Sequence, residues 1–485
     1  MAFTKSIIFK SFIWKLLERC SVQVVSFVVT IVLARILMPS DYGQIALVMV
    51  FVNLANVIVD GGLNQALIQK KQTDDTDFST IFHVCMLVSL FLYGVMFVAA
   101  PAIAGFYEAP GLVPVIRVLS LSLPLYSFNS IQRAYISRHM LFKSLFKSSL
   151  LAVMGSGLVG ILMAMQGMGV WALVGSSLSS AFLMIVVMWF TVDWKPRIVF
   201  SVEGFKSLFA YGWKIFFSNF IIALFVNIRS LIIGKVYTAA SLAFFDRGKQ
   251  FPSLIMENIN ASIQTVLFPV FSAEQENRDK VRSMVSRSIK MSVFVISPMM
   301  MALFAMSKPL IVLLLTEKWL MAVPFVRIFC IAYLLMPIQI ANIEAIKSLG
   351  RSDVILKLEL IKKVLEVTIL VISVFINVYA IAVGVIIYNF ICIFINLFPN
   401  KKLLDYSIGQ QIKDVVPSLT ASLVMGASIY AMQWIDVNNF VILLMQGLGA
   451  VVIYAAICYF FKLESFRYLV QMIWNFKKGA NTIDK

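Results

Sequence analysis

Charged side chains are scarce in this 485-residue chain: 13% of its residues are Asp, Glu, Lys or Arg, whereas 60% are hydrophobic. A soluble domain carries about 25% charged and about 45–50% apolar residues. So much apolar surface excludes a soluble globular fold. A bilayer accommodates it, because helices satisfy their own backbone hydrogen bonds there. The composition therefore predicts an all-α, polytopic membrane protein.

Residue types that build catalytic or metal sites are also few. There are two histidines, and the five cysteines lie far apart inside apolar stretches, without a Cys-x-x-Cys spacing. Such cysteines are small core residues rather than metal ligands or disulfides. Asp75-Thr76-Asp77 has the D-x-D pattern of metal-dependent sugar transfer, but a turn with a helix cap is the simpler interpretation. We therefore expect no enzymatic activity, no cofactor and no metal site.

Apolar runs dominate what is present. A spanning helix needs roughly 20 mostly apolar residues, and fourteen stretches qualify as candidates. They lie near residues 12–36, 41–66, 80–100, 112–135, 148–166, 170–190, 210–235, 242–271, 289–312, 323–345, 359–377, 380–399, 415–434 and 440–461. No extramembrane domain is expected between them, and an even number of spans places both termini on one side.

The net charge of +17 indicates membrane topology rather than nucleic-acid binding, because the basic residues occupy short loops between apolar runs. Of the 41 lysines and arginines, 32 lie on the side of the termini. The other nine are Arg35, Arg117, Arg229, Lys235, Arg247, Lys249, Lys308, Lys318 and Arg327. Since loops rich in Lys and Arg remain inside, we expect both termini to be cytoplasmic.

A weak internal repeat of 200 to 210 residues divides the chain. Ile116-Arg117-Val118-Leu119 matches Val326-Arg327-Ile328-Phe329, for example. We expect an N-lobe at 1–190, a cytoplasmic linker at 191–209, a C-lobe at 210–400, and two further helices with a cytoplasmic tail at 401–485. Six helices per lobe give a pseudo-twofold axis along the membrane normal, as in transporters that rock two halves around a central site.

Polar residues inside the predicted spans form stripes at helical spacing. The stripes lie in the helices near 12–36, 41–66, 210–235 and 242–271, and together they predict a wet cavity between the lobes. Its more cationic lining suits an anionic substrate such as a diphosphate. The candidate phosphate- and glycan-binding residues are Arg229, Arg19, Arg247, Asn53, Asn56 and Gln250. Glu257 and Asp60 are the candidates for ion coupling.

Alternative roles stay open for several of these residues. Arg19 and Lys15 lie close to the inner surface and equally suit snorkelling. Arg229 lies about 12 Å below the outer end of its helix, too deep for easy snorkelling. Glu257 either forms a structural ion pair or carries a proton or cation. Asp60 suits a cap or an ion pair better than coupling.

Six short motifs, taken in order, resemble Wzx-type polysaccharide repeat-unit flippases. They are similar to the branch near the colanic-acid exporter, in the multidrug/oligosaccharidyl-lipid/polysaccharide (MOP) exporter superfamily. The motifs lie at Ala34–Gly43, Asp60–Lys70, Gly167–Leu173, Trp194–Arg197, Thr316–Trp319 and Leu349–Asp353. The resemblance covers about residues 12–400. The chain departs from the pattern at Thr316, where Gly is more usual, and at Phe244–Arg247, which usually begins Gly-x-Tyr.

The resemblance implies a V-shaped, two-lobed fold of fourteen helices in the inner membrane of a Gram-negative cell. It implies movement of undecaprenyl-diphosphate-linked oligosaccharide from the inner to the outer leaflet for capsule, exopolysaccharide or O-antigen synthesis. The expected partners are the lipid-linked oligosaccharide, membrane lipids and a polysaccharide polymerase or export machinery, with no nucleic acid. A peptidoglycan-precursor flippase and a drug/cation antiporter of the same superfamily are the alternatives; a membrane enzyme or a scaffold fits the polar stripes and short loops less well.

Overall fold

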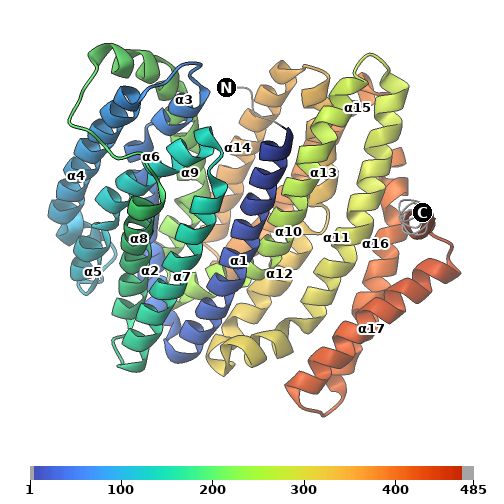
Figure 1. Cartoon of the computed structure of the whole chain (residues 1–485). Coiled ribbons are helices and arrows are strands. Elements are labelled where there is room, and N and C mark those ends of the chain that lie inside the picture. Colours follow the sequence, from blue (N-terminus) through green and yellow to red (C-terminus); the bar gives the residue numbers. More distant parts are fainter. Residues whose placement is uncertain (1–4, 472–485) are drawn as a thin grey trace, which may run out of the picture. The chain divides into compact units, whose positions relative to one another are not determined.

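The computed structural model describes residues 5–471, and their side chains at 10–260, 267 and 269–471. Every regular element in these residues is helical (Figure 1). The first nine helices are α1 (Lys5–Ile36), α2 (Pro39–Asp60), α3 (Leu63–Gln69), α4 (Asp75–Phe106), α5 (Leu112–Leu119), α6 (Ser122–His139), α7 (Phe142–Met165), α8 (Val170–Thr191) and α9 (Val202–Val236). The others are α10 (Ala239–Ala273), α11 (Arg278–Leu315), α12 (Val323–Tyr333), α13 (Met336–Ser348), α14 (Ser352–Val374), α15 (Val378–Leu403), α16 (Ile408–Ala431) and α17 (Asn439–Phe460). Short 3-10 helices cover Glu317–Ala322 and Met432–Trp434.

The all-α membrane architecture is confirmed, and each of the fourteen expected spans coincides with helix. Twelve helical stretches of the described residues have the length and mean hydropathy of a membrane span. The expected spans near 242–271 and 359–377 are not among them, and they coincide with α10 and α14. Both helices are long enough to cross a bilayer. Helix α14 carries four charged residues in its middle, Glu359, Lys362, Lys363 and Glu366, which distinguishes it from the twelve.

Three of the expected spans are not single helices. The span near 41–66 ends at Asp60 and restarts as α3 after Gly61 and Gly62, both of which have positive φ. The spans near 112–135 and 323–345 are divided into α5–α6 and α12–α13. Pro124 and Pro337 lie in the first turn of each second segment. A proline lacks the N–H that would continue the preceding turn, which explains the break.

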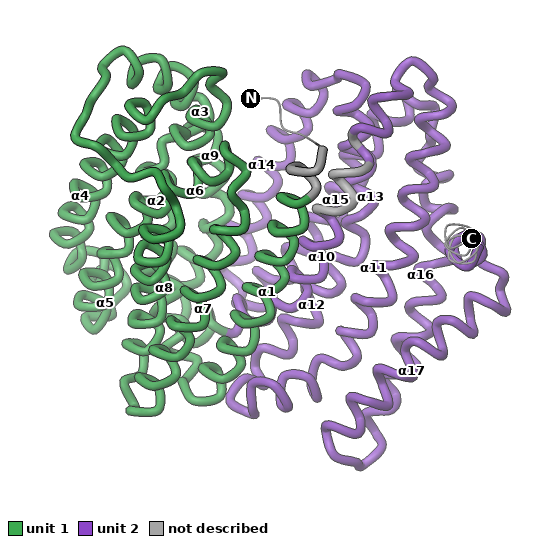
Figure 2. Tube along the Cα trace, in the orientation of Figure 1, with its two compact units in different colours: residues 1–243 green, residues 244–485 purple. Residues whose placement is uncertain are grey.

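The contacts divide the chain into two compact units, Met1–Ala243 and Phe244–Lys485 (Figure 2). Helix α9 packs against α2, α3 and α4, so it belongs to the first unit. The internal repeat, by contrast, groups α9 with residues 210–400. The compact units and the predicted lobes therefore divide the chain at different places, and the pseudo-twofold relation stays a prediction. The end of the predicted tail, beyond residue 471, lies outside the described residues.

Two side-chain contacts recur at the repeat distance, one in each unit. The Nε of Arg117 donates to the carbonyl of Phe97 at 3.3 Å, and the Nε of Arg327 donates to the Oγ of Ser307 at 3.0 Å. Each acceptor lies 20 residues before its arginine. Each guanidinium also lies near a phenylalanine ring, Phe97 at 4.4 Å for the first and Phe304 at 5.6 Å for the second. The internal repeat predicted from the sequence thus has a counterpart in side-chain geometry.

Glycines permit close helix contacts in the first unit. A Cβ on Gly62 would lie 2.3 Å from the carbonyl oxygen of Gly212, and a Cβ on Gly234 would lie 1.9 Å from the Leu47 side chain. The N-terminal part of α9 therefore contacts the C-terminal end of α2, and the C-terminal part of α9 contacts the N-terminal part of α2. The two helices thus run antiparallel. Likewise, a Cβ on Gly43 would lie 1.8 Å from the carbonyl oxygen of Ala239.

The D-x-D sequence forms the start of α4 rather than a metal site. Asp74 is the N-cap and accepts a hydrogen bond from the backbone N–H of Asp77 at 2.8 Å. The carboxylate of Asp77 pairs with Lys70 at 2.7 Å. Asp75 pairs with Arg197 of the linker at 3.5 Å. Capping and ion pairing thus explain the acidic cluster.

A network of buried amides holds the second unit together. Its members are Gln339 and Asn342 on α13, Asn389, Asn396 and Asn400 on α15, and Gln411 on α16. Asn342 donates to the Oε1 of Gln411 at 2.8 Å, and Asn400 donates to the Oδ1 of Asn342 at 2.6 Å. Asn342 therefore connects three helices. Hydrogen bonds between amides on different helices stabilise contacts that the hydrophobic effect does not drive in lipid.

Candidate functional site

Arg229 is the central residue of the candidate site in the first unit. It lies on α9, is half-buried, and falls between the two contacts of α9 with α2 at Gly212 and Gly234. Asn53 and Asn56 lie in the last third of α2, which runs antiparallel to α9. The arginine and the amide stripe therefore lie on two neighbouring helices, a pairing that the sequence did not predict.

The two asparagines differ in exposure. Asn53 is exposed, whereas Asn56 is half-buried and its Oδ1 has no hydrogen-bond partner among the described residues. On α9, the Nδ2 of Asn227 donates to the carbonyl of Ala223 at 2.8 Å, which leaves its side chain lying along its own helix. A buried amide oxygen without a protein partner is an acceptor available to water or to a ligand hydroxyl.

Asp60 ends α2 at the Gly61-Gly62 turn. Its carboxylate accepts a hydrogen bond from Asn64 in the first turn of α3, and it is half-buried. The contact of Gly62 with Gly212 fixes this turn against α9. The geometry agrees with the capping or pairing role that the sequence favoured, and ion coupling at Asp60 stays a proposal.

Arg19 lies on α1, which packs against α7. The guanidinium is exposed, one turn beyond Lys15, whose Nζ pairs with Glu18 at 2.9 Å. Trp14 packs against Phe146 of α7 with ring centroids 5.5 Å apart, which orients this face of α1. In the first unit, α1 makes its most extensive contacts with α7.

Arg247, Gln250 and Glu257 lie on α10 in the second unit. The Nη1 of Arg247 donates to the Oε1 of Gln250 at 2.5 Å, and its guanidinium lies 6.0 Å from the ring of Trp319. Glu257 is exposed. Gln264 lies at helical spacing on the same predicted face as Arg247, Gln250 and Glu257, and its side chain is outside the described residues.

The predicted cavity between the lobes draws residues from both units, so it stays a prediction. Within each unit, the candidate residues are of types that suit phosphate and sugar groups. Arginine presents a fork of donors that suits phosphate, and amides bind hydroxyl groups. Among the described residues, no group of three His, Cys, Asp or Glu side chains is placed to hold a metal ion.

Sequence reasoning missed four charges on α14. Lys362 pairs with Glu359, and Lys363 pairs with Glu366 at 2.8 Å. The side chains of Lys362 and Glu366 are only 7% and 8% exposed. Lys362 and Glu366 are four residues apart, which places them on one face of the helix. This pattern was available in the sequence. Because each cation pairs with a carboxylate three residues away, the pairs lower the cost of burying charge.

Comparison with solved structures shows the fold. The chain matches the lipid II flippase MurJ in an inward closed conformation with a TM-score of 0.74, covering 95% of this chain and 100% of that one at 16% identity. An inward-facing MATE family multidrug resistance transporter of the MOP superfamily matches with a TM-score of 0.57, covering 79% of this chain and 94% of that one, also at 16% identity. The fold is therefore MurJ- and MATE-like.

Curated relatives point to surface polysaccharides. The chain is 23% identical to the succinoglycan biosynthesis transport protein ExoT of Rhizobium meliloti, over 72% of this chain and 71% of the relative. It is 25% identical to the teichuronic acid biosynthesis protein TuaB of Bacillus subtilis, over 62% of each chain. It is 21% identical to the lipopolysaccharide biosynthesis protein WzxC of Escherichia coli, over 70% of each.

These findings confirm the resemblance that the short motifs indicated. Residues 32–324 match a family described as polysaccharide biosynthesis protein, Polysacc_synt_3, which is more than half of the chain. The match contains α2 with its amide stripe, the whole of α9 with Arg229, and α10 with Arg247. The chain is a multi-span membrane protein and belongs to the Polysacc_synt_3 family of polysaccharide biosynthesis proteins.

Proposed function

We propose that this protein is a flippase that moves undecaprenyl-diphosphate-linked oligosaccharide repeat units from the inner to the outer leaflet of the cytoplasmic membrane. The product would serve capsule, exopolysaccharide or O-antigen synthesis. The family match and the relatives named for polysaccharide biosynthesis support the pathway. The MurJ-like fold supports transport of a lipid-linked sugar rather than catalysis.

One observation carries the proposal for the site: a half-buried arginine and an amide stripe lie on two neighbouring antiparallel helices that have the length of membrane spans. An intramembrane arginine is costly, so it indicates a function by default. Arg229 is suited to bind the diphosphate in bidentate fashion, while Asn53 and Asn56 bind sugar hydroxyls.

The proposed mechanism is alternating access. The polyprenyl tail stays in the bilayer, and the diphosphate and glycan pass through the polar site as the lobes rock. An interior-negative potential assists outward movement of the anionic group, by about 2.3 kcal/mol for each charge across 100 mV. Arg19, Arg247 and Gln250 are the further phosphate- and glycan-binding candidates, and Glu257 is the candidate for ion coupling.

The solved relatives suggest two other substrates. The likeness to MurJ favours a peptidoglycan precursor as the second candidate. The likeness to a multidrug transporter favours an organic cation. A cation requires an acidic site, whereas the site in the first unit is built around an arginine, so an anionic lipid is the better match.

The test is flipping of a fluorescent undecaprenyl-diphosphate oligosaccharide in proteoliposomes, with leaflet exposure read by a membrane-impermeant glycan-modifying enzyme. We expect Arg229→Ala to slow flipping about 10- to 100-fold, because a hydrogen-bonded charge contributes about 1.5–3 kcal/mol. Lys206→Ala removes an exposed cation from the first turns of the same helix and serves as the matched control.

The outcomes separate the function from the site. Loss of flipping in Arg229→Ala alone supports both. Equal flipping by the wild type and both variants would keep the function and remove Arg229 from the phosphate site. Absence of flipping of any lipid-linked glycan by the folded wild-type protein would refute the function and favour the antiporter.

A further inference from the structure

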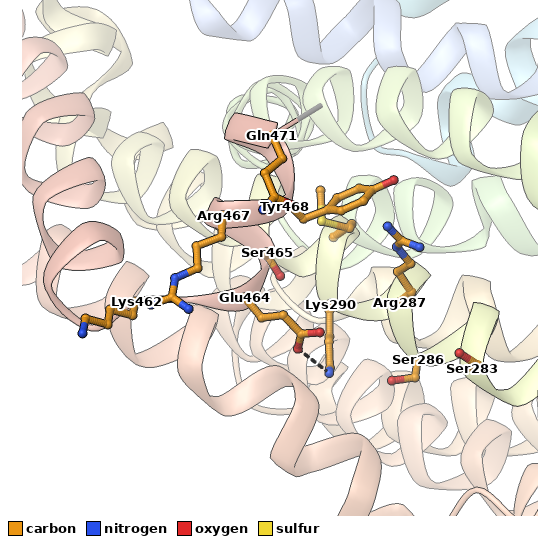
Figure 3. Close-up of a pocket in the computed structure, with 11 residues that line it drawn as sticks. Ser283, Ser286, Arg287, Lys290, Lys462, Glu464, Ser465, Arg467, Tyr468 and Gln471 are labelled. Carbon is orange, nitrogen blue, oxygen red and sulfur yellow. Dashed lines mark hydrogen bonds and ion pairs between the residues drawn. The ribbon is translucent and has the colours of Figure 1, made fainter. Parts of the chain in front are cut away.

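A second basic site lies in the second unit, away from the residues discussed so far. A cavity of about 570 Å³ opens between the first turns of α11 and the helical segment 464–471 that follows α17 (Figure 3). The charged and aromatic residues around it are Arg287, Lys290, Lys462, Glu464, Arg467 and Tyr468. Four of these side chains are cations and one is an anion, so the cavity has a net positive charge.

The carboxylates near this cavity are already engaged. Glu464 accepts from the Nζ of Lys290 at 2.9 Å, as the dashed line in Figure 3 shows. Lys290 also pairs with Asp414 at 3.4 Å, and Asp414 accepts from the Oγ of Ser286 at 2.5 Å. Glu464, Asp414 and Lys290 together carry one net negative charge. The other three cations of the cavity, Arg287, Lys462 and Arg467, outweigh it, so the site keeps a net positive charge.

The two arginines of the cavity keep their donors available. The guanidinium carbon of Arg287 lies 3.8 Å from the centroid of the Tyr468 ring, within the range of a cation–π contact. Within the described part of the chain, neither Arg287 nor Arg467 forms a side-chain hydrogen bond or an ion pair. Two arginine forks and the Ser465 hydroxyl therefore line a cavity without a protein anion to bind.

The depth of the cavity indicates where its ligand comes from. Helix α17 ends in Tyr459 and Phe460, followed by Phe461, and each of these side chains is more than two-thirds exposed. Exposed aromatic side chains gather at the boundary between the bilayer and water. Lys462 follows directly and lines the cavity. The cavity thus lies at headgroup depth, at two helix ends that the distribution of Lys and Arg places on the cytoplasmic side.

We propose that this cavity binds the phosphodiester headgroup of an anionic membrane phospholipid of the phosphatidylglycerol type. Basic pockets between helices on the cytoplasmic side recognise such headgroups. Arg287 and Arg467 bind the phosphate oxygens, and Ser465 is placed for the glycerol hydroxyls. A lipid bound here bridges α11 and the segment 464–471, so it secures the end of the chain that follows the last membrane helix.

The test uses the full-length protein in detergent and native mass spectrometry, with phosphatidylglycerol and phosphatidylcholine titrated separately. We expect the wild type to retain phosphatidylglycerol in preference to phosphatidylcholine. The double variant Arg287→Ala/Arg467→Ala should weaken phosphatidylglycerol binding roughly 10- to 30-fold, since each cation near the surface contributes about a factor of five. Arg278→Ala/Lys402→Ala removes the same charge from exposed positions outside the cavity and is the matched control.

Two results would overturn the proposal. One is equal loss of phosphatidylglycerol by both double variants, which would mean general charge attraction. The other is complete displacement of the lipid by millimolar inorganic phosphate, which would make the cavity a site for a soluble anion. If the alanine variant fails to fold, Arg287→Lys/Arg467→Lys keeps the charge and removes the forks, and reduced retention by that variant still supports the site. No glycan lipid is used, so failure here leaves the proposed flipping untouched.

Discussion

Replacing Gly43 by alanine tests whether the beginning of α2 is in contact with the backbone at Ala239. A Cβ at this position would lie 1.8 Å from the carbonyl oxygen, 2.3 Å from the carbonyl carbon and 2.9 Å from the Cα of Ala239. Real Cβ atoms essentially never approach a heavy atom closer than 3.0 Å, so the two backbones must separate by about 1.2 Å. All three atoms belong to the backbone, so no side-chain rotation relieves the clash.

The size of the effect follows from two opposing contributions. Alanine favours the helix over glycine by about 1 kcal/mol, whereas overpacking costs about 1–3 kcal/mol. The cost lies at the upper end here because backbone must move, so Gly43→Ala should lower the free energy of unfolding by about 1–2 kcal/mol. Gly94→Ala, in the interior of α4 with nothing within 4 Å of the added Cβ, should raise it by about 0.5–1 kcal/mol.

The assay is thermal unfolding of the two purified variants in the same detergent. A change of 1 kcal/mol shifts Tm by about 2–4 °C in a chain of 150–250 residues, and the first compact unit ends at residue 243. We therefore expect the Tm of Gly43→Ala to lie several degrees below that of Gly94→Ala. Identical Tm values, or a higher value for Gly43→Ala, would refute the close backbone contact.

Three further predictions concern the hydrogen bonds and ion pairs. Asn342→Ala should lower the free energy of unfolding by about 1–2 kcal/mol in thermal unfolding, because it leaves two buried amide partners unpaired. Arg138→Lys should increase cleavage near residues 67–71 by a protease specific for apolar residues, because a lysine cannot replace three bonds of 2.8–3.1 Å to the carbonyls of Leu67, Ile68 and Lys71. Lys235→Met should raise the pKa of Glu108, because the hydrogen bond and charge of Lys235 lower that pKa in the wild type. A carboxylate with a lowered pKa stabilises the fold at pH values above its ordinary pKa. The variant should therefore have a lower Tm than the wild type at pH 7, and this difference should disappear as the pH falls through the lowered pKa.

Matched substitutions make these predictions specific. Thr420→Ala removes an exposed hydroxyl that bonds only within its own helix, and it should leave Tm almost unchanged. Arg133→Lys alters an exposed arginine on the same helix as Arg138 and should not change proteolysis. Equal effects of test and control, or a Tm difference for Lys235→Met that does not shrink as the pH falls, would contradict the assigned contacts.

The sequence predicted the positions of the helices because apolar runs of spanning length are hard to build otherwise. It did not predict that three of the runs are broken, since hydrophobicity continues through Ser120-Leu121 and through Leu334-Leu335. Pro124 and Pro337 mark these two breaks, and Gly61-Gly62 marks the third. Helix breaks of this kind depend on local backbone chemistry, which hydropathy does not measure.

The candidate site was predictable residue by residue but not as a whole. Helical spacing placed Asn53 and Asn56 on one face, and the depth of Arg229 in its span marked it as unusual. The neighbourhood of α2 and α9 depends on glycine contacts such as Gly62 with Gly212, between residues 150 positions apart. The pattern of one helix cannot reveal which other helix lies opposite, so the pairing required the structure.

The buried amide network at Asn342 has a consequence for how the second unit responds to its surroundings. Amide side chains carry no net charge and do not titrate near neutral pH. A membrane potential does work only on charges, so it contributes no free energy to separating these amide groups. The amide junction of α13, α15 and α16 therefore carries no charge, so neither a change in voltage nor acidification weakens it. Energy taken from an ion gradient must therefore enter through other residues.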